Sequence, residues 1–152
     1  MNHEALATEM RGLRERVPGI TDTAVAAADG MLIAADTAAV IEAESLAAIA
    51  AAGLGIARRA TAATGRGTFR QTVTHGSQGC AAFYACGDTA LLIVLGDEGI
   101  DLEGLHERIR PVLGRVAAIL AGDDPEPATA APYTSGLLTG AVTEPATATE
   151  GV

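Results

Sequence analysis

The sequence predicts an α+β domain in which three helices pack on a five-stranded antiparallel sheet. Three observations predict this class. Apolar residues recur at helical spacing in three separate segments, and five short segments have strand character. The turns within each run of strands are short, which forces antiparallel pairing. The predicted order is α-β-β-α-β-β-β-α, and a chain of 152 residues suits one such domain with a tail.

Each predicted element has local signals that set its limits. Pro18-Gly19 stops the first helix, and Asp29-Gly30 is a two-residue hairpin signal. Pro111 falls inside the last helix, where it must kink the helix or begin a second segment, because proline lacks an N–H. The predicted elements in chain order are helix 3–16, strand 20–28, strand 31–36, helix 42–64, strand 68–75, strand 80–86, strand 89–95 and helix 102–121.

Two of the strands have contrasting polarity. Residues 89–95 are apolar almost throughout, which is typical of a central strand covered on both faces. Residues 68–75 are polar enough to form an edge strand, and an unprotected edge is a template for pairing with another chain. We therefore expect a two-fold homodimer in which two such edges make one continuous sheet. The strand residues expected at that interface are Phe69, Gln71 and Val73.

The second helix is apolar or small on all sides from Leu46 to Ala57. A helix that covers one face of a sheet needs only one apolar stripe, and exposed apolar patches usually mark interfaces. We expect this helix to pack on the sheet and on a copy of itself; the alternative is that alanine is simply a strong helix former at exposed sites. The expected sheet-facing stripe is Leu46, Ile49, Gly53 and Ile56. The residues expected on the outer, dimer-forming side are Ala47, Ala51 and Leu54.

Composition and charge exclude several classes of function. All ten basic residues are arginine, so no nucleotide-binding or Schiff-base lysine exists, and a net charge of −9 argues against nucleic-acid binding. The apolar run of the second helix is shorter than the about 20 residues that a membrane span needs, so direct membrane insertion is not expected. The first residues have no apolar signal-peptide core. We expect a cytoplasmic protein that reaches membranes only through partners.

No arrangement of reactive side chains predicts an active site. His3, His75 and His106 are scattered, and neither HExxH nor CxxC spacing occurs. Cys80 and Cys86 lie in one predicted strand, about 20 Å apart at 3.3 Å per residue, which is too far for a disulfide. They are interpreted as small buried residues, with an intermolecular or redox role as the alternative. We expect a non-enzyme without a metal or another cofactor.

The composition changes near residue 122. Residues 123–152 are rich in alanine, threonine, proline and acids and contain no basic residue. Such a segment has few apolar anchors, so the predicted division is a folded domain at residues 1–121 and a disordered acidic tail at residues 122–152.

The order of elements, together with several local strings, resembles the Roadblock/LC7 family, and within it the bacterial MglB-like and actinobacterial conservon-type proteins. The resemblance covers about residues 1–121. Its strings are Leu13 with Val17-Pro18-Gly19-Ile20, Asp29-Gly30-Met31-Leu32-Ile33-Ala34, Glu44-Ser45-Leu46-Ala47-Ala48, and Leu91-Leu92-Ile93-Val94-Leu95.

This resemblance implies a homodimer that serves a Ras-like small GTPase without being an enzyme, often beside a sensor-kinase-like protein. Some family members accelerate GTP hydrolysis by remodelling the GTPase. On this basis Arg58, Arg59 and Arg66 are candidates for the surface that meets an acidic GTPase. Two alternatives stay open: a dimerisation scaffold without effect on GTP turnover, and a small-ligand-sensing α+β module of PAS or profilin-like shape.

Overall fold

The computed structural model describes residues 1–123 and contains three helices and five strands in the predicted order. Strand β3 begins three residues later than residue 68. Helix α3 continues through Pro111 as one helix, so of the two outcomes expected there, a second segment is excluded. The elements are α1 His3–Arg16, β1 Ile20–Ala27, β2 Leu32–Asp36, α2 Ala43–Ala63, β3 Gln71–Gly76, β4 Gly79–Cys86, β5 Ala90–Gly96 and α3 Leu102–Leu120.

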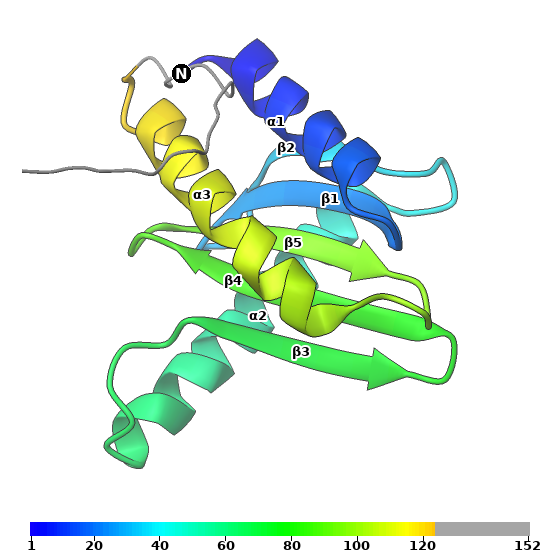
Figure 1. The fold of residues 1–152 in the computed structure, drawn as a ribbon. Helices are drawn as coiled ribbons and strands as arrows, with labels where there is room; N and C mark the ends of the chain where they lie inside the picture. The colour runs from blue at the N-terminus through cyan, green and yellow to red at the C-terminus, as the bar shows by residue number, and fades with distance from the viewer. Residues whose placement is uncertain (124–152) are drawn as a thin grey trace, which may run out of the picture.

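The five strands form one antiparallel sheet in the order β2-β1-β5-β4-β3 (Figure 1). Strand β5 is central, and its residues Leu91, Leu92 and Ile93 are fully buried. This confirms the expectation from its apolar sequence, because a central strand is covered on both faces. Strand β3 forms one edge, as its polarity predicted.

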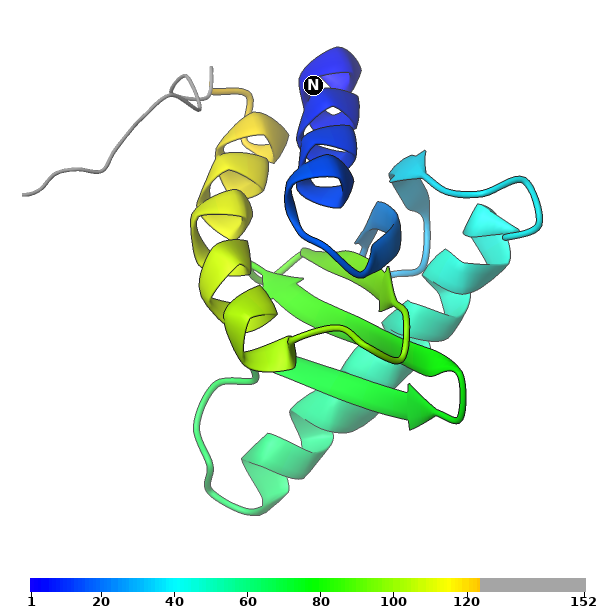
Figure 2. The ribbon, with the colours of Figure 1, turned by 45° about the vertical axis from the view of Figure 1, so that its right-hand side comes forward.

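The helices lie in two layers on opposite faces of the sheet. Helices α1 and α3 cover one face, and α2 crosses the other face obliquely (Figures 1 and 2). The larger core fills the space under α1 and α3 and includes Leu6, Met10 and Ile109. The smaller core lies under α2 and includes Leu54 and Phe83. The fold is therefore a three-layer sandwich of the predicted α+β class.

Short polar side chains set the beginnings of α1 and α3. The Asn2 side chain accepts a hydrogen bond from the Ala5 backbone N–H at 3.0 Å, and the Asp101 side chain accepts one from Gly104 at 3.2 Å. These caps satisfy backbone donors that have no partner within the first helical turn. Gly30 adopts a φ of 99° in the β1–β2 turn, a conformation that glycine takes without strain.

Ion pairs join α1 to β2 and to α3, and a buried carboxylate of β1 fastens the β2–α2 connection to the sheet. Arg14 pairs with Asp36 of β2 at 2.6 Å, and Arg115 of α3 pairs with Glu9 of α1 at 2.7 Å. Asp22 is 4% exposed and accepts a 2.7 Å hydrogen bond from the backbone N–H of Ala38. Because a buried carboxylate needs donors, this contact fixes the path of the chain leading into α2.

The predicted acidic tail lies almost wholly outside the described residues. Helix α3 ends at Leu120, next to the boundary predicted at residue 121, and residues 124–152 fall outside the described part. The division of the chain into domain and tail stays a prediction.

Candidate functional site

The outer face of α2 carries large apolar side chains that nothing in the described chain covers. Ile49 is 63% exposed and Ile56 is 71% exposed, although most exposed positions of a lone surface helix would be polar. Small exposed residues continue the same face, so it has little charge until Arg59. We define the α2 stripe as Ala48, Ile49, Ala52, Gly55, Ile56 and Ala60.

The rotation of α2 about its axis differs from the expected one, although Leu46 and Gly53 pack toward the sheet as expected. Ala47 and Leu54, expected outside, are 0% and 1% exposed and pack in the smaller core. Ile49 and Ile56, expected against the sheet, face outward. Ala51 is half-buried.

Close packing between the helix and the sheet explains this rotation. The sheet surface under α2 has small residues, Ala24 and Ala26, on β1 beside the larger Phe83, Leu91 and Ile93 of β4 and β5, and the small residues allow the helix backbone to approach. At Gly53 an added Cβ would lie 3.3 Å from the Phe83 ring, so the helix fits against that aromatic side chain only through a small residue. The larger isoleucines are consequently left outside, because a close helix has no room for them beneath it.

The β3 edge provides a second unpaired surface. Its register with β4 is continuous from Gln71 to Gly76, and the strand contains neither a charged residue nor proline. Edge strands that resist pairing normally carry such residues or a bulge. By contrast, β2 at the opposite edge is short, its pairing with β1 is interrupted by a register shift, and it ends at the Arg14–Asp36 ion pair.

The three β3-region residues predicted at the interface have different environments. Gln71 is exposed and Val73 is half-buried, so both offer surface to another chain. Phe69 is 6% exposed and fills the smaller core, so it supports this edge from within. Of the whole predicted interface set, Ala47, Leu54 and Phe69 are therefore core residues of the single chain.

The α2 stripe and the β3 edge lie on adjacent sides of the molecule. Helix α2 runs obliquely under the sheet, and its C-terminal turns project beyond β3 (Figures 1 and 2). By length and composition, α2 is long and apolar enough to cross a membrane. Only 17% of its apolar 18-residue segment is buried within the domain. Its inner face belongs to the core of the domain, so the uncovered apolar surface is confined to the outer face.

The three candidate arginines sit around the C-terminal end of α2. Arg58 is half-buried, and its guanidinium donates a 3.2 Å hydrogen bond to the backbone carbonyl of Asp88 in the β4–β5 turn. Arg59 and Arg66 are exposed, and Arg66 lines a groove of about 520 Å³ between the end of α2 and the start of β3. Arg58 therefore anchors a turn, whereas Arg59 and Arg66 present free charge.

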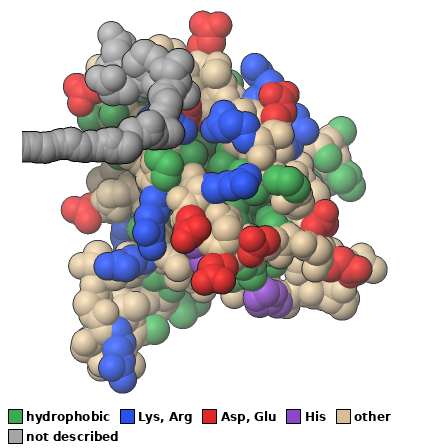
Figure 3. Space-filling view, in the orientation of Figure 1, with side chains coloured by type: hydrophobic (Ala, Val, Ile, Leu, Met, Phe, Trp, Pro, Cys, Tyr) green, Lys and Arg blue, Asp and Glu red, His purple; other side chains and the backbone are tan. Residues whose placement is uncertain are grey.

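The opposite face, formed by α1 and α3, has mixed charge. Arginine and carboxylate side chains are interspersed over it (Figure 3). A face without one dominant sign gives no electrostatic preference for a charged macromolecule. The α2 side therefore has the clearer features of a partner surface.

The described residues contain no assembled catalytic or metal centre. Within residues 1–123 no group of three or more His, Cys, Asp or Glu side chains could hold a metal ion. Ser77 and Asp88 lie in the turns at opposite ends of β4, so they cannot form a triad with His75.

A part-buried polar pair on the α3 side of the sheet has no signal in the sequence. The Tyr84 hydroxyl lies 2.7 Å from Nδ1 of His106. These residues are far apart in sequence, and no local motif links them. Only the packing of α3 on β4 brings them together.

The sequence model of the Roadblock/LC7 domain matches residues 6–96, from α1 to the end of β5. The chain belongs to the Roadblock/LC7 domain family. This confirms the resemblance seen in the sequence.

Relatives and solved structures agree with this assignment. Uncharacterized protein MJ0310 of Methanocaldococcus jannaschii is 33% identical over 104 residues, which cover 68% of this chain and 90% of that protein. A Roadblock/LC7 domain from Streptomyces avermitilis superposes with a TM-score of 0.71 at 24% identity, covering 76% of this chain and 97% of that one. MglB of Myxococcus xanthus gives a TM-score of 0.73 at 16% identity, covering 80% and 99%. At identities of 24% and 16%, these two structures show that this chain shares their fold.

The two cysteines of this Roadblock/LC7 domain are free thiols, as predicted. Cys86 is 4% exposed, and burial raises its pKa from 9.0 to about 11. Cys80 is half-buried, and burial raises its pKa as well. Because the thiolate is the reactive form, both groups are poorly suited to redox chemistry.

We expect Cys86 to be almost unreactive toward a disulfide reagent in the native chain at pH 8. A pKa raised by two units lowers the thiolate fraction about 100-fold relative to the unfolded chain. The raised pKa stabilises the fold below pH 9, and this contribution is lost as the pH rises through about 11. Thiol titration of the Cys80→Ser variant, native and in denaturant, measures Cys86 alone. Equal rates in both states would contradict the assignment of Cys86 as a buried thiol.

Proposed function

We propose that this Roadblock/LC7 domain is a homodimeric, non-catalytic adaptor that regulates a Ras-like small GTPase. The observation that carries the proposal is the α2 stripe, an apolar surface that a single chain leaves in water. Burial of apolar surface is favourable at about 25 cal/mol per Å², so a partner that covers the stripe is stabilising.

A second copy of this chain fits the stripe and the β3 edge together. A two-fold axis beside β3 would pair the two edge strands antiparallel, since a two-fold interface uses the same surface on both subunits. The C-terminal turns of α2, which project beyond β3, would then reach under the sheet of the partner. Ile49 and Ile56 would be buried between paired helices, with Ala52 and Gly55 allowing close approach.

Membership of the Roadblock/LC7 family supports a GTPase as the further partner. Family members bind or regulate Ras-like small GTPases, and bacterial members act beside such a GTPase and a sensor-kinase-like protein. The exposed Arg59 and Arg66 lie at the end of the proposed dimer helix, where they could pair with acidic side chains of a GTPase. Arg58 would act indirectly, by fixing the β4–β5 turn.

The dimer predicts a specific effect of charge on the α2 stripe. We expect the wild-type chain to have twice the 15.3 kDa mass of one chain, and Ile56→Glu to weaken association at least about 100-fold, because the carboxylate would be buried without a partner. Val40→Glu is the matched control: Val40 is 87% exposed and lies outside the stripe, so this variant should stay dimeric.

Light scattering across a dilution series, with circular dichroism to verify folding, measures these masses. A folded Ile56→Glu variant that remains as dimeric as Val40→Glu would exclude the stripe as the interface.

The GTPase proposal is tested by affinity capture from native cytoplasm with GDP or a non-hydrolysable GTP analogue. We expect a Ras-like GTPase to be retained, and the Arg59→Glu/Arg66→Glu variant to bind it at least about tenfold more weakly, because interfacial charge pairs are reversed. Arg11→Glu is the control, since Arg11 is exposed on α1 across the sheet.

GTP turnover of the captured GTPase, with and without this protein, separates regulator from scaffold. A changed rate supports regulation, whereas binding without any change in rate supports the scaffold. If no GTPase is retained under either nucleotide, the proposed partner is wrong.

A further inference from the structure

A cavity of about 690 Å³ opens on the α3 side of the sheet, where β3 begins and β4 ends. Its volume falls within the range of about 300–1,000 Å³ found for small-molecule sites. Apolar walls come from three elements: Phe69 before β3, Ala85 of β4, and Ile109 and Leu113 of α3. None of these residues belongs to the α2 stripe, but Gln71 at the start of β3 also lines the cavity, so the cavity borders the β3 edge of the proposed dimer surface.

The cavity contains an aromatic polar pair. Tyr84 is 2% exposed, and its hydroxyl lies 2.7 Å from Nδ1 of His106, with the two rings edge to face at 71°. Burial raises the pKa of Tyr84 well above its ordinary value, so the phenol stays protonated at neutral pH. When this O–H donates to Nδ1, a neutral imidazole carries its proton on Nε2. No described residue accepts a hydrogen bond from that nitrogen, so it remains a donor for a ligand.

Two guanidinium groups give the cavity positive charge in a chain whose net charge is −9. Arg70 and Arg110 both line it, and neither has a carboxylate within 4.0 Å among residues 1–123, where the ion pairs are Arg14–Asp36 and Arg115–Glu9. Asp88 is the one acidic residue in the lining.

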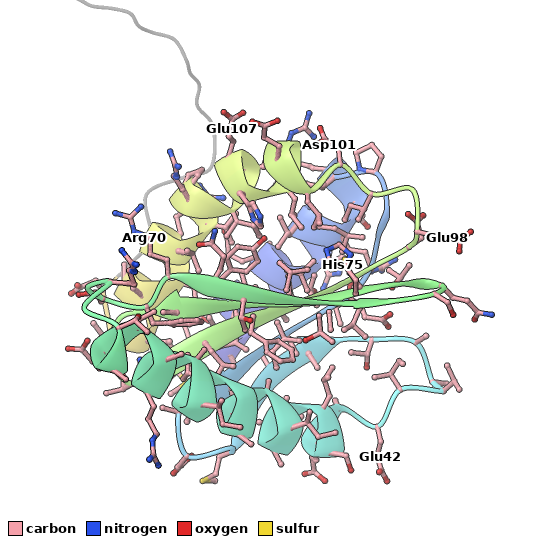
Figure 4. All side chains as sticks on the ribbon, turned by 90° about the horizontal axis from the view of Figure 1, so that it is seen from below. Glu42, Arg70, His75, Glu98, Asp101 and Glu107 are labelled. Atoms are coloured by element: carbon pink, nitrogen blue, oxygen red, sulfur yellow. The ribbon has the colours of Figure 1, made fainter. Side chains whose placement is uncertain are left out.

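The side-chain view places these charges relative to the sheet. Arg70 lies beside α3, whereas Glu107 is on the outer side of that helix and points away from the sheet (Figure 4). His75 lies toward the other end of the sheet. The α3 carboxylate nearest in sequence to His106 therefore does not neutralise the cavity.

This combination of groups selects one chemical class of ligand. Guanidinium groups bind phosphate and carboxylate oxygens through paired N–H donors. Apolar walls beside those donors suit a ligand that has an apolar body as well as a charged head. A fully structural role for the Tyr84–His106 pair would leave neither an open volume of this size nor two arginines without carboxylate partners.

We propose that this cavity binds a small organic anion whose oxyanion head meets Arg70 and Arg110 and whose apolar body lies against Phe69 and Leu113. Two guanidiniums favour a doubly charged head, so an organic phosphate binds more tightly than a carboxylate of the same size. His106 Nε2 adds a hydrogen bond to the head, and Tyr84 orients the imidazole. This inference does not depend on the GTPase, and its binding groups come from one chain, although Gln71 of the lining also belongs to the β3 edge of the proposed dimer.

The test uses the full chain and three probes that share one ring: phenyl phosphate, benzoate and neutral benzamide. Binding is followed by amide chemical shifts in ¹H–¹⁵N NMR spectra, which also report whether each variant is folded. We expect affinity to fall in the order phenyl phosphate, benzoate, benzamide, with shifts concentrated at residues 68–71 and 106–113.

Variants assign the binding groups. Arg110→Gln and Arg70→Gln should each weaken phenyl phosphate at least about tenfold while benzamide is unaffected, because a charge-assisted contact is lost. Tyr84→Phe should change the His106 ring resonances and weaken phenyl phosphate several-fold. Arg11→Gln, on the exposed side of α1, should bind phenyl phosphate as the wild type does.

Three results would each overturn the proposal. The first is that neither anion binds, and the second is that benzamide binds as well as phenyl phosphate. The third is that folded Arg70→Gln and Arg110→Gln variants keep the affinity of the wild type, which would place the anion elsewhere on the chain.

Discussion

Helix α2 has apolar side chains around its circumference, and one sheet can cover only one side of it. Which face of α2 packs on the sheet therefore decides which apolar side chains remain exposed. Small residues at positions 47, 50 and 57 bring the helix close to the sheet, with Leu54 between them. The isoleucines at positions 49 and 56 are then left in contact with water. A second apolar surface is therefore built into the single chain, and the proposed dimer is the simplest way to cover it.

The edge strand β3 likewise leaves groups without partners in the single chain, but these are backbone groups. Its outer N–H and C=O groups have no partner in the sheet, and its sequence provides neither charge nor proline against pairing. The uncovered helix face and the unpaired strand edge lie on adjacent sides of the molecule (Figure 2). One two-fold axis can satisfy both, which accounts for their occurrence together better than two separate partners would.

Much of the fold was predictable because its signals are local. Turn sequences such as Asp29-Gly30 and the apolar run of β5 define the elements and the sheet centre. The rotation of α2 was predicted wrongly, because an alanine-rich helix has weak amphipathicity and its inner face depends on the shape of the sheet below. Residues 47 and 54 were therefore placed outside when they belong to the core.

The candidate sites also divide into features that local sequence predicts and features that depend on the packing of distant elements. The β3 edge followed from strand polarity, and the free cysteines followed from their spacing within one strand. The small-ligand alternative required a pocket, but the position of this cavity between β4 and α3, and the pairing of Tyr84 with His106 in it, could not be predicted, because both depend on where α3 lies over β4. The arginines that line it, Arg70 and Arg110, come from different elements and show no sequence pattern of their own.

In the proposed dimer a second copy covers the α2 stripe and extends the sheet at β3. Hydrogen exchange of the β3 amides that point away from β4 tests it most directly, because a lone edge strand leaves these groups in water. We expect these amides, together with the outer amides at the end of α2, to exchange slowly at high protein concentration and to lose protection on dilution. Exchange at the rate of exposed loops at every concentration would contradict the proposed dimer.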